Sequence, residues 1–211
     1  MRIISHRGYW KQEIEKNSEI AFHRSFRLNI GTETDFRDYN GELVISHDIP
    51  TEGTFISADE FGMILNQYTS GLPLAINIKS DGIHKVVKEF IYSLGINDYF
   101  VFDMSIPDTI NYLNLGINVF IRQSEYEKDL PFYELVKGIW LDAFENIWYS
   151  EVTVKKHISN GKRVAIVSNE LHNREHLKHW NFLKSWSIIN DDNLILCTDR
   201  PEEATKFFKY E

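Results

Sequence analysis

The sequence has one cysteine, few prolines and no long apolar run, and each shortage excludes a class of protein. Cys197 is the single cysteine among 211 residues, so no internal disulfide can form, which fits a reducing compartment. No apolar stretch approaches the roughly 18–20 residues that cross a bilayer. The chain starts Met-Arg-Ile-Ile-Ser, which lacks the features of a signal peptide. We therefore predict a cytoplasmic protein without a membrane span.

Positive charge is also scarce. Lysine and arginine together number 23 against 31 acidic residues, which gives a formal net charge of -8. A general nucleic-acid-binding protein would carry a basic face, so that class is disfavoured, although a local anion site is not. The length and the 43% hydrophobic content fit one globular domain covering residues 1–211. The oligomeric state stays open.

Short β-rich runs alternate with longer helical patterns along the whole chain. Strands are predicted at residues 2–6, 31–38, 74–79, 99–105, 118–124, 138–144, 163–169 and 193–198. Helices are predicted at residues 18–28, 58–66, 85–94, 107–115, 132–136, 152–159 and 175–184. This alternation predicts an α/β fold, the single-domain (β/α)₈ TIM barrel. An open doubly wound sheet is the alternative, but no glycine-rich phosphate-binding turn follows any strand.

Residues 31–48 are predicted to form a β-hairpin that turns at an Asn-Gly pair. Glu33 and Asp35 stand two apart on its first arm, so a strand projects both from one face. Two carboxylates side by side on an inward face repel each other unless a cation offsets them. Oxygen ligands suit Mg²⁺ or Ca²⁺, so we predict a divalent-cation site, with a solvent-facing sheet edge as the alternative.

A (β/α)₈ barrel places its functional groups where strands end, and polar residues stand at those positions. His6 and Arg7 end the first strand; arginine suits phosphate oxygens and histidine titrates near neutrality. Lys79 shares a strand face with Asn77 and can meet an anion, and Arg122 is a further phosphate candidate. The alternative for each is an ordinary solvated strand end.

Two histidine patterns remain. His47 stands beside Asp48 at the end of the hairpin, where a carboxylate can orient the ring for acid–base work. The alternative is an aspartate that stabilises the turn beside an incidental histidine. His172 and His176 are four apart, a loose metal spacing, but no third strong ligand stands nearby, which favours a solvated helix face.

The order of these motifs resembles that of the glycerophosphodiester phosphodiesterases. The resemblance spans almost the whole chain and is most specific in the first fifty residues. The motifs that carry it are His6-Arg7-Gly8, Asn17-Ser18, Gly31-x-Glu33-x-Asp35, His47-Asp48, Ile76-Asn77-Ile78-Lys79 and Thr198-Asp199-Arg200-Pro201.

The resemblance implies a (β/α)₈ barrel that hydrolyses a small phosphodiester to a phosphomonoester and an alcohol. It implies that His6 and His47 form an acid–base pair and that Arg7 binds the phosphate. Glu33 and Asp35 would hold Mg²⁺ or Ca²⁺. The family usually has a glutamate as third protein ligand at the position of Asn77. An amide oxygen there removes one negative charge, so we expect weaker cation binding.

Two further departures bear on the substrate. Glu15-Lys16 stands where the family has Pro-Glu, which reverses a charge near the expected site mouth. Residues 49–57 are short, whereas many members carry an insertion there that shapes the glycerol pocket. The phosphodiesterase chemistry is therefore better supported than the glycerol specificity. The alternative is a catalytically weakened barrel that binds a phosphorylated sugar or lipid headgroup without turnover.

Overall fold

The computed structural model describes residues 1–68 and 71–209 of the chain, and these fall into two compact units. The N-terminal unit is Ser5–Val119. The C-terminal unit combines Met1–Ile4 with Phe120–Glu211. The single domain expected for residues 1–211 stays a prediction.

The N-terminal unit is built around β2 (Gly31–Tyr39). The end of β1 (Arg2–His6) lies beside β2, and β5 (Leu74–Ile78) pairs in parallel with β2 and with β6 (Tyr99–Phe102). β3 (Glu42–Ile45) returns antiparallel along the far end of β2, and the short β4 (Ile56–Ser57) pairs with β3. Beyond β6, Val101 forms an isolated bridge with Val119. The predicted hairpin is therefore confirmed.

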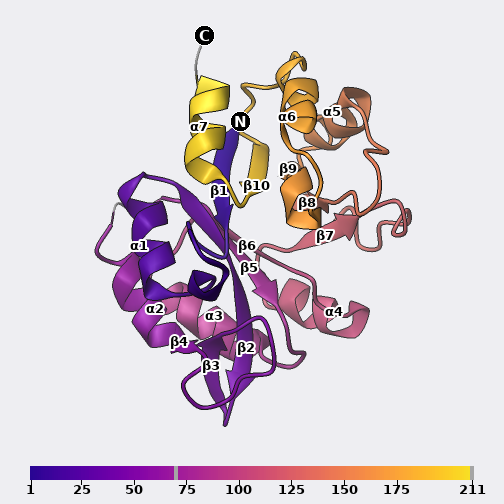
Figure 1. Ribbon diagram of the computed structural model, residues 1–211. Coiled ribbons are helices and arrows are strands. Elements are labelled where there is room, and N and C mark those ends of the chain that lie inside the picture. The colour runs from indigo at the N-terminus through magenta and orange to yellow at the C-terminus, as the bar shows by residue number, and fades with distance from the viewer. Residues whose placement is uncertain (69–70, 210–211) are drawn as a thin grey trace. The chain divides into compact units, whose positions relative to one another are not determined.

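Four α-helices accompany the strands in the part of this unit that the structure describes. They are α1 (Glu19–Arg27), α2 (Ala58–Leu65), α3 (His84–Ser93) and α4 (Ile106–Asn114), with a short 3₁₀ turn, η1, at Glu13–Glu15. α1 and α2 pack side by side (Figure 1). Phe36 of β2 packs edge-on against Phe61 and Phe90 of these helices, with ring centroids 6.2 and 5.2 Å away. Because side chains alternate along a strand, Glu33 and Asp35 project from the opposite face of β2.

The C-terminal unit has four consecutive parallel strands. They are β7 (Phe120–Gln123), β8 (Gly138–Leu141), β9 (Arg163–Val167) and β10 (Leu194–Thr198), and β1 lies next to β10. Its helices are α5 (Glu151–Ser159), α6 (Leu177–Lys184) and α7 (Pro201–Lys209), with a 3₁₀ turn, η2, at Asn169–His172. In the residues that the structure describes, no helix is long and apolar enough to span a membrane.

All eight predicted strands are present, but the helix predicted at residues 132–136 is wrong. This segment consists of turns, in which the backbone N–H groups of Leu135 and Val136 both donate to the carbonyl of Phe132. Phe132 has a φ of 61°, a left-handed conformation that cannot continue into a right-handed helix. Five residues are also too few to stabilise a helix without strong packing.

Candidate active site in the N-terminal unit

The end of β1 and the loop that follows it place His6 and Arg7 beside β2. Arg7 has a φ of 57° and Gly8 a φ of 78°. The backbone N–H of Arg7 donates to the carbonyl of Glu33 at 3.0 Å and to its Oε2 at 3.1 Å. A Cβ on Gly8 would lie 2.7 Å from the Cβ of Ala21, so only glycine lets this loop approach α1 so closely.

Asp35 is the most completely enclosed charge of the site, with no exposed surface. Its Oδ2 lies 2.9 Å from Nε of Arg7 and accepts a hydrogen bond of 2.8 Å from Nδ2 of Asn17. Its Oδ1 lies 3.3 Å from Nζ of Lys79 at the end of β5. Two cations and one amide therefore surround this carboxylate, which offsets the large penalty for burying an isolated charge.

Glu33 lies two residues earlier on the same face and is 1% exposed. Its Oε2 lies 3.9 Å from Nε2 of His6. Burial, together with the smaller effect of the nearby Asp35 charge, raises the pKa of Glu33 to about 7. Burial also acts to raise the pKa of Asp35, but Arg7 and Lys79 outweigh it and hold this pKa below its ordinary value. The two carboxylates of β2 therefore differ in their affinity for protons.

Asn77 supplies a third oxygen beside this pair. It lies on β5 directly opposite Asp35 of β2 and is 7% exposed. Its Oδ1 is buried and has no hydrogen-bond partner among the residues that the structure describes. In the same described ranges, no group of three or more His, Cys, Asp or Glu side chains is arranged to hold a metal ion. Two carboxylates and one unpaired amide oxygen still form a donor set that suits a hard cation such as Mg²⁺ or Ca²⁺.

His47 shares a cavity of about 380 Å³ with Arg7. The ring Nδ1 of His47 lies 2.8 Å from Oδ1 of Asp48, an arrangement that favours a proton on Nδ1 and leaves Nε2 as the proton acceptor. Arg37 donates to the carbonyl of His47 at 3.1 Å and fixes the end of the hairpin. The cavity is lined by Arg7, Glu13, Lys16, Asn17, Ile45, Ser46, His47, Asp48, Ile49, Thr51 and Thr54.

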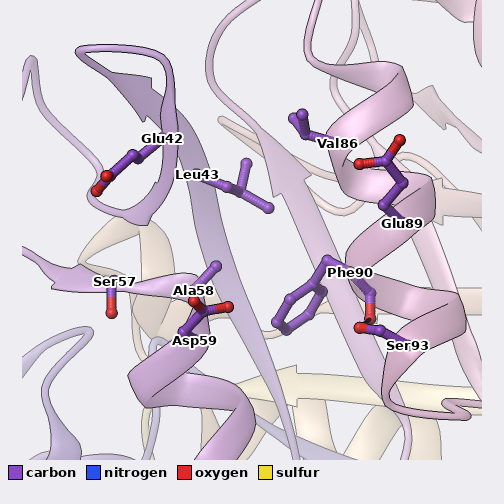
Figure 2. A pocket seen from close by; sticks show the side chains of 9 residues that line it. All are labelled: Glu42, Leu43, Ser57, Ala58, Asp59, Val86, Glu89, Phe90 and Ser93. Atoms are coloured by element: carbon purple, nitrogen blue, oxygen red, sulfur yellow. Dashed lines mark hydrogen bonds between the residues drawn. The ribbon is translucent and has the colours of Figure 1, made fainter.

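A second cavity of about 470 Å³ lies between β3, α2 and α3 of the same unit. Figure 2 shows Leu43 and Phe90 pointing into the space between these elements. Its lining contains three carboxylates and no lysine, arginine or histidine: Glu42, Leu43, Ser57, Ala58, Asp59, Val86, Glu89, Phe90 and Ser93. This set of charges repels a phosphate, so the cavity of Arg7 and His47 is the one that suits an anionic ligand.

Arg122 lies in the C-terminal unit, at the end of β7. Its Nε is 3.8 Å from Oε2 of Glu127, and its guanidinium lies 5.7 Å from the ring centroid of Phe144. Its assignment as a phosphate ligand stays a prediction.

His172 and His176, the loosely spaced pair, contact different carboxylates. Nε2 of His172 lies 2.6 Å from Oδ1 of Asp142, and Nε2 of His176 lies 3.2 Å from Oε1 of Glu203. Each ring therefore has its own acidic partner, and the two residues lie on different elements, His172 in η2 and His176 just before α6, rather than on one solvated helix face.

Asn17 is the site residue for which the sequence suggested no role of its own. Its φ is 58°, its backbone N–H donates to the carbonyl of Arg7 at 2.9 Å, and its Oδ1 accepts from Thr34 at 3.0 Å. With its Nδ2 on Asp35, it ties the loop after β1 to β2. The available signal was an asparagine in a loop next to a serine N-cap position, because asparagine tolerates a left-handed backbone.

No protein-family model matches the chain, and no curated protein matches it. Several solved structures match almost its full length, and three of them are described here. A protein of Galdieria sulphuraria proposed to be a glycerophosphodiester phosphodiesterase is 16% identical, with a TM-score of 0.79, and the match covers 99% of this chain and 98% of that one. A phosphodiesterase of Oleispira antarctica, solved with the product sn-glycerol-3-phosphate, is 15% identical, with a TM-score of 0.74 and coverage of 100% and 97%.

The third structure is a glycerophosphodiester phosphodiesterase of Parabacteroides distasonis. It is 15% identical, with a TM-score of 0.73, and the match covers 98% of this chain and 96% of that one. At these identities the likeness establishes the fold. The predicted α/β fold of the (β/α)₈ type is therefore confirmed.

Proposed function

We propose that this protein is a metal-assisted phosphodiesterase that hydrolyses a small, glycerophosphodiester-like substrate to a phosphomonoester and an alcohol. The observation that carries the proposal is the contact network in which Arg7 and Lys79 enclose Asp35 while His6 lies against Glu33. The fold supports it, because it is shared with an enzyme solved with sn-glycerol-3-phosphate as its product. We assign this activity to the cytoplasm, since the single cysteine is typical of proteins kept in a reducing compartment.

Arg7 and Lys79 bind the phosphoryl oxygens in this mechanism. Arginine presents a planar fork of donors that matches phosphate, and lysine adds a compact positive charge. Glu33, Asp35 and the amide oxygen of Asn77 would hold Mg²⁺ or Ca²⁺. When bound there, the cation adds positive charge that stabilises the phosphoryl oxygens as the phosphorus–oxygen bonds change.

His6 and His47 carry the protons. One of them takes the proton from the attacking hydroxyl, whose oxygen forms the new bond to phosphorus. The bond from phosphorus to the alcohol oxygen breaks, and the other histidine protonates that oxygen, because an unprotonated alkoxide is a poor leaving group. Asp48 keeps the ring of His47 in one orientation through its contact with Nδ1. The same two proton transfers serve water as the nucleophile or a neighbouring substrate hydroxyl that gives a cyclic phosphate.

Replacement of either histidine tests the assignment. We expect His6→Ala and His47→Ala each to lower turnover by about 10²–10⁴-fold, the usual contribution of a positioned acid or base. Phosphorus NMR of glycerophosphodiesters incubated with each protein measures the monoester formed, and urea unfolding checks that the fold is kept. His23→Gln is the matched control, since His23 contacts Tyr68 on the helical side of the unit. Full activity in either alanine variant would contradict the proposal.

Removal of divalent cations tests the metal part separately. We expect EDTA to abolish hydrolysis and added Mg²⁺ or Ca²⁺ to restore it. Without the cation, the two buried carboxylates lack the positive charge that positions the phosphate. Turnover that never depends on a divalent cation would refute the metal assignment and leave the histidine assignment standing.

A second candidate is a barrel that binds a phosphorylated sugar or lipid headgroup without turnover. The observation that favours it is the amide of Asn77 where a third carboxylate would strengthen the cation site. Across a broad panel of diesters, unchanged phosphorus spectra together with a binding-induced shift would support this candidate over the enzyme.

A further inference from the structure

Two isoleucines near the candidate active site are almost fully exposed. Ile14 is 90% exposed and Ile49 is 81% exposed, the highest values among the large hydrophobic side chains that the structure describes. Ile49 lines the cavity of Arg7 and His47, and Ile14 follows Glu13, which lines the same cavity. A scattered exposed isoleucine is ordinary, but two beside one ligand cavity indicate a surface that meets an apolar partner.

The neighbouring side chains extend this apolar rim. Lys16 lines the cavity, and its Nζ lies 4.5 Å from the ring centroid of Trp10. The flexible stem of the lysine and the indole ring therefore lie on the η1 side of the opening. Residues 47–55, which supply other lining residues of the cavity, form no helix or strand, and they leave Ile49 uncovered.

The size of the cavity limits what it can hold. About 380 Å³ is near the lower end of the range for small-molecule sites, roughly 300–1,000 Å³. Among its polar lining residues, Arg7, Asn17 and His47 suit a phosphodiester head. A long hydrocarbon chain attached to that head does not fit beside it and has to leave over the rim, where Ile49 stands.

We propose that the substrate is a phosphodiester that carries one hydrocarbon chain, and that this chain packs on Ile49 and Ile14 while the phosphate binds at Arg7. This inference rests on the proposed function and names the substrate class of the same site. The rim acts as a specificity element, since it contacts the chain and not the reacting atoms. Removing apolar surface from water on both partners supplies the affinity.

A chain-length series tests the proposal. We would measure kcat/KM by phosphorus NMR for glycerophosphodiesters bearing no acyl chain, a four-carbon chain and an eight-carbon chain, all below their micelle concentrations. We expect kcat/KM to rise about tenfold from the chainless to the eight-carbon substrate. The ratio of these two values should fall several-fold towards one in Ile49→Ser and Ile14→Ser. Met63→Ser, at an apolar site on α2 that is 62% exposed and lies outside the cavity lining, should keep the wild-type ratio.

A second experiment identifies the source of the substrate that carries the hydrocarbon chain. The eight-carbon diester is presented as free monomers and then within neutral phospholipid vesicles. Faster cleavage of monomers supports a soluble amphiphile, and faster cleavage in vesicles supports a lipid surface, provided that the isoleucine variants reduce it. A wild-type ratio of one, or an unchanged ratio in both isoleucine variants, overturns the inference while hydrolysis of the chainless diester keeps the proposed function. Hydrolysis of no diester at all overturns the function itself.

Discussion

Arg7 and Asn17 hold left-handed backbone conformations that side-chain-bearing residues rarely adopt, with φ of 57° and 58°. Each such residue costs on the order of 1–3 kcal/mol and persists only where surrounding contacts fix it. Here the N–H of Arg7 bonds to Glu33, and the carbonyl of Arg7 accepts from Asn17. The strained pair thereby aims a guanidinium and an amide at one buried carboxylate, Asp35.

Gly8→Ala tests how tightly this loop must approach α1. We expect it to lower the free energy of unfolding by about 2–3 kcal/mol, because a Cβ would meet Ala21 and the φ of 78° is left-handed. Gly82→Ala is the matched control: its φ is 88° but its Cβ would meet nothing within 4 Å. Urea unfolding of both variants separates steric contact from backbone strain. Equal losses in the two variants would show that the contact with Ala21 contributes nothing.

Asn77→Glu tests whether the amide limits cation affinity. A third carboxylate opposite Asp35 should tighten the apparent Kd for Mg²⁺ or Ca²⁺ by roughly tenfold, since hard cations prefer charged oxygen ligands. In EDTA the same variant should unfold at a lower temperature than wild type, because a further buried carboxylate then lacks a positive counter-charge. Calorimetric titration measures the affinity, with Asn77→Ala as the variant that removes the oxygen. Tighter binding by Asn77→Ala than by wild type would contradict this role.

At the scale of elements, the β2–β3 hairpin sets the position of His47. Its turn residues, Asn40 and Gly41, have φ of 51° and 85°, and a two-residue type I′ hairpin turn requires positive φ at both positions. Gly41→Ala should lower the free energy of unfolding by about 1 kcal/mol, whereas Gly41→Asn should lower it less, because asparagine tolerates this conformation. Thermal unfolding of the two variants provides the comparison. An alanine variant as stable as wild type would show that the turn conformation is not required.

The interiors of the strands were predictable from the sequence, but some of their ends were not. The strand predicted at residues 99–105 ends at Phe102, because Asp103 has a φ of 71° that the apolar pattern does not reveal. α7 was absent from the predicted helices, although proline at its first position, Pro201, is a recognised start signal.

The candidate site was predictable in part, because some of its residues lie on strands whose side chains alternate between two faces. Strand periodicity puts Glu33 and Asp35 on one face, and the structure agrees. The contact of Asn17 with Asp35 depends on a loop conformation, and no periodic pattern encodes loop geometry.

For the molecule as a whole, one buried histidine predicts a loss of stability in acid. His179 is fully buried, and its Nε2 lies 2.8 Å from the hydroxyl of Tyr149. Burial lowers the pKa of His179 to about 4, with a smaller contribution from the charge of Arg174. An unfolded histidine titrates near 6.5, so between pH 6.5 and 4 the unfolded chain binds more protons and stability falls as pH falls.

Unfolding in urea at pH 7 and pH 4 measures this effect when wild type is compared with His179→Gln. The difference in unfolding free energy between the two proteins should shrink by about 3 kcal/mol at the lower pH. Glu33, whose raised pKa removes stability as pH rises from about 4.5 to 7, is present in both proteins and cancels. A difference that does not change with pH would show that His179 is not neutral in the folded protein.

The positions of contacting residues along the chain also determine the order in which contacts can form during translation. The ion-pair and hydrogen-bond partners of Asp35 described above are Arg7, Asn17 and Lys79, so a ribosome has delivered all three before it translates Phe120. The C-terminal unit follows the opposite order, because β1 lies beside β10, which is translated near the end. At roughly 5–20 residues per second, the first few residues wait about ten seconds or more for that neighbour. The nascent chain can thus arrange the proposed active-site groups around Asp35 while β1 is still unpaired on that side.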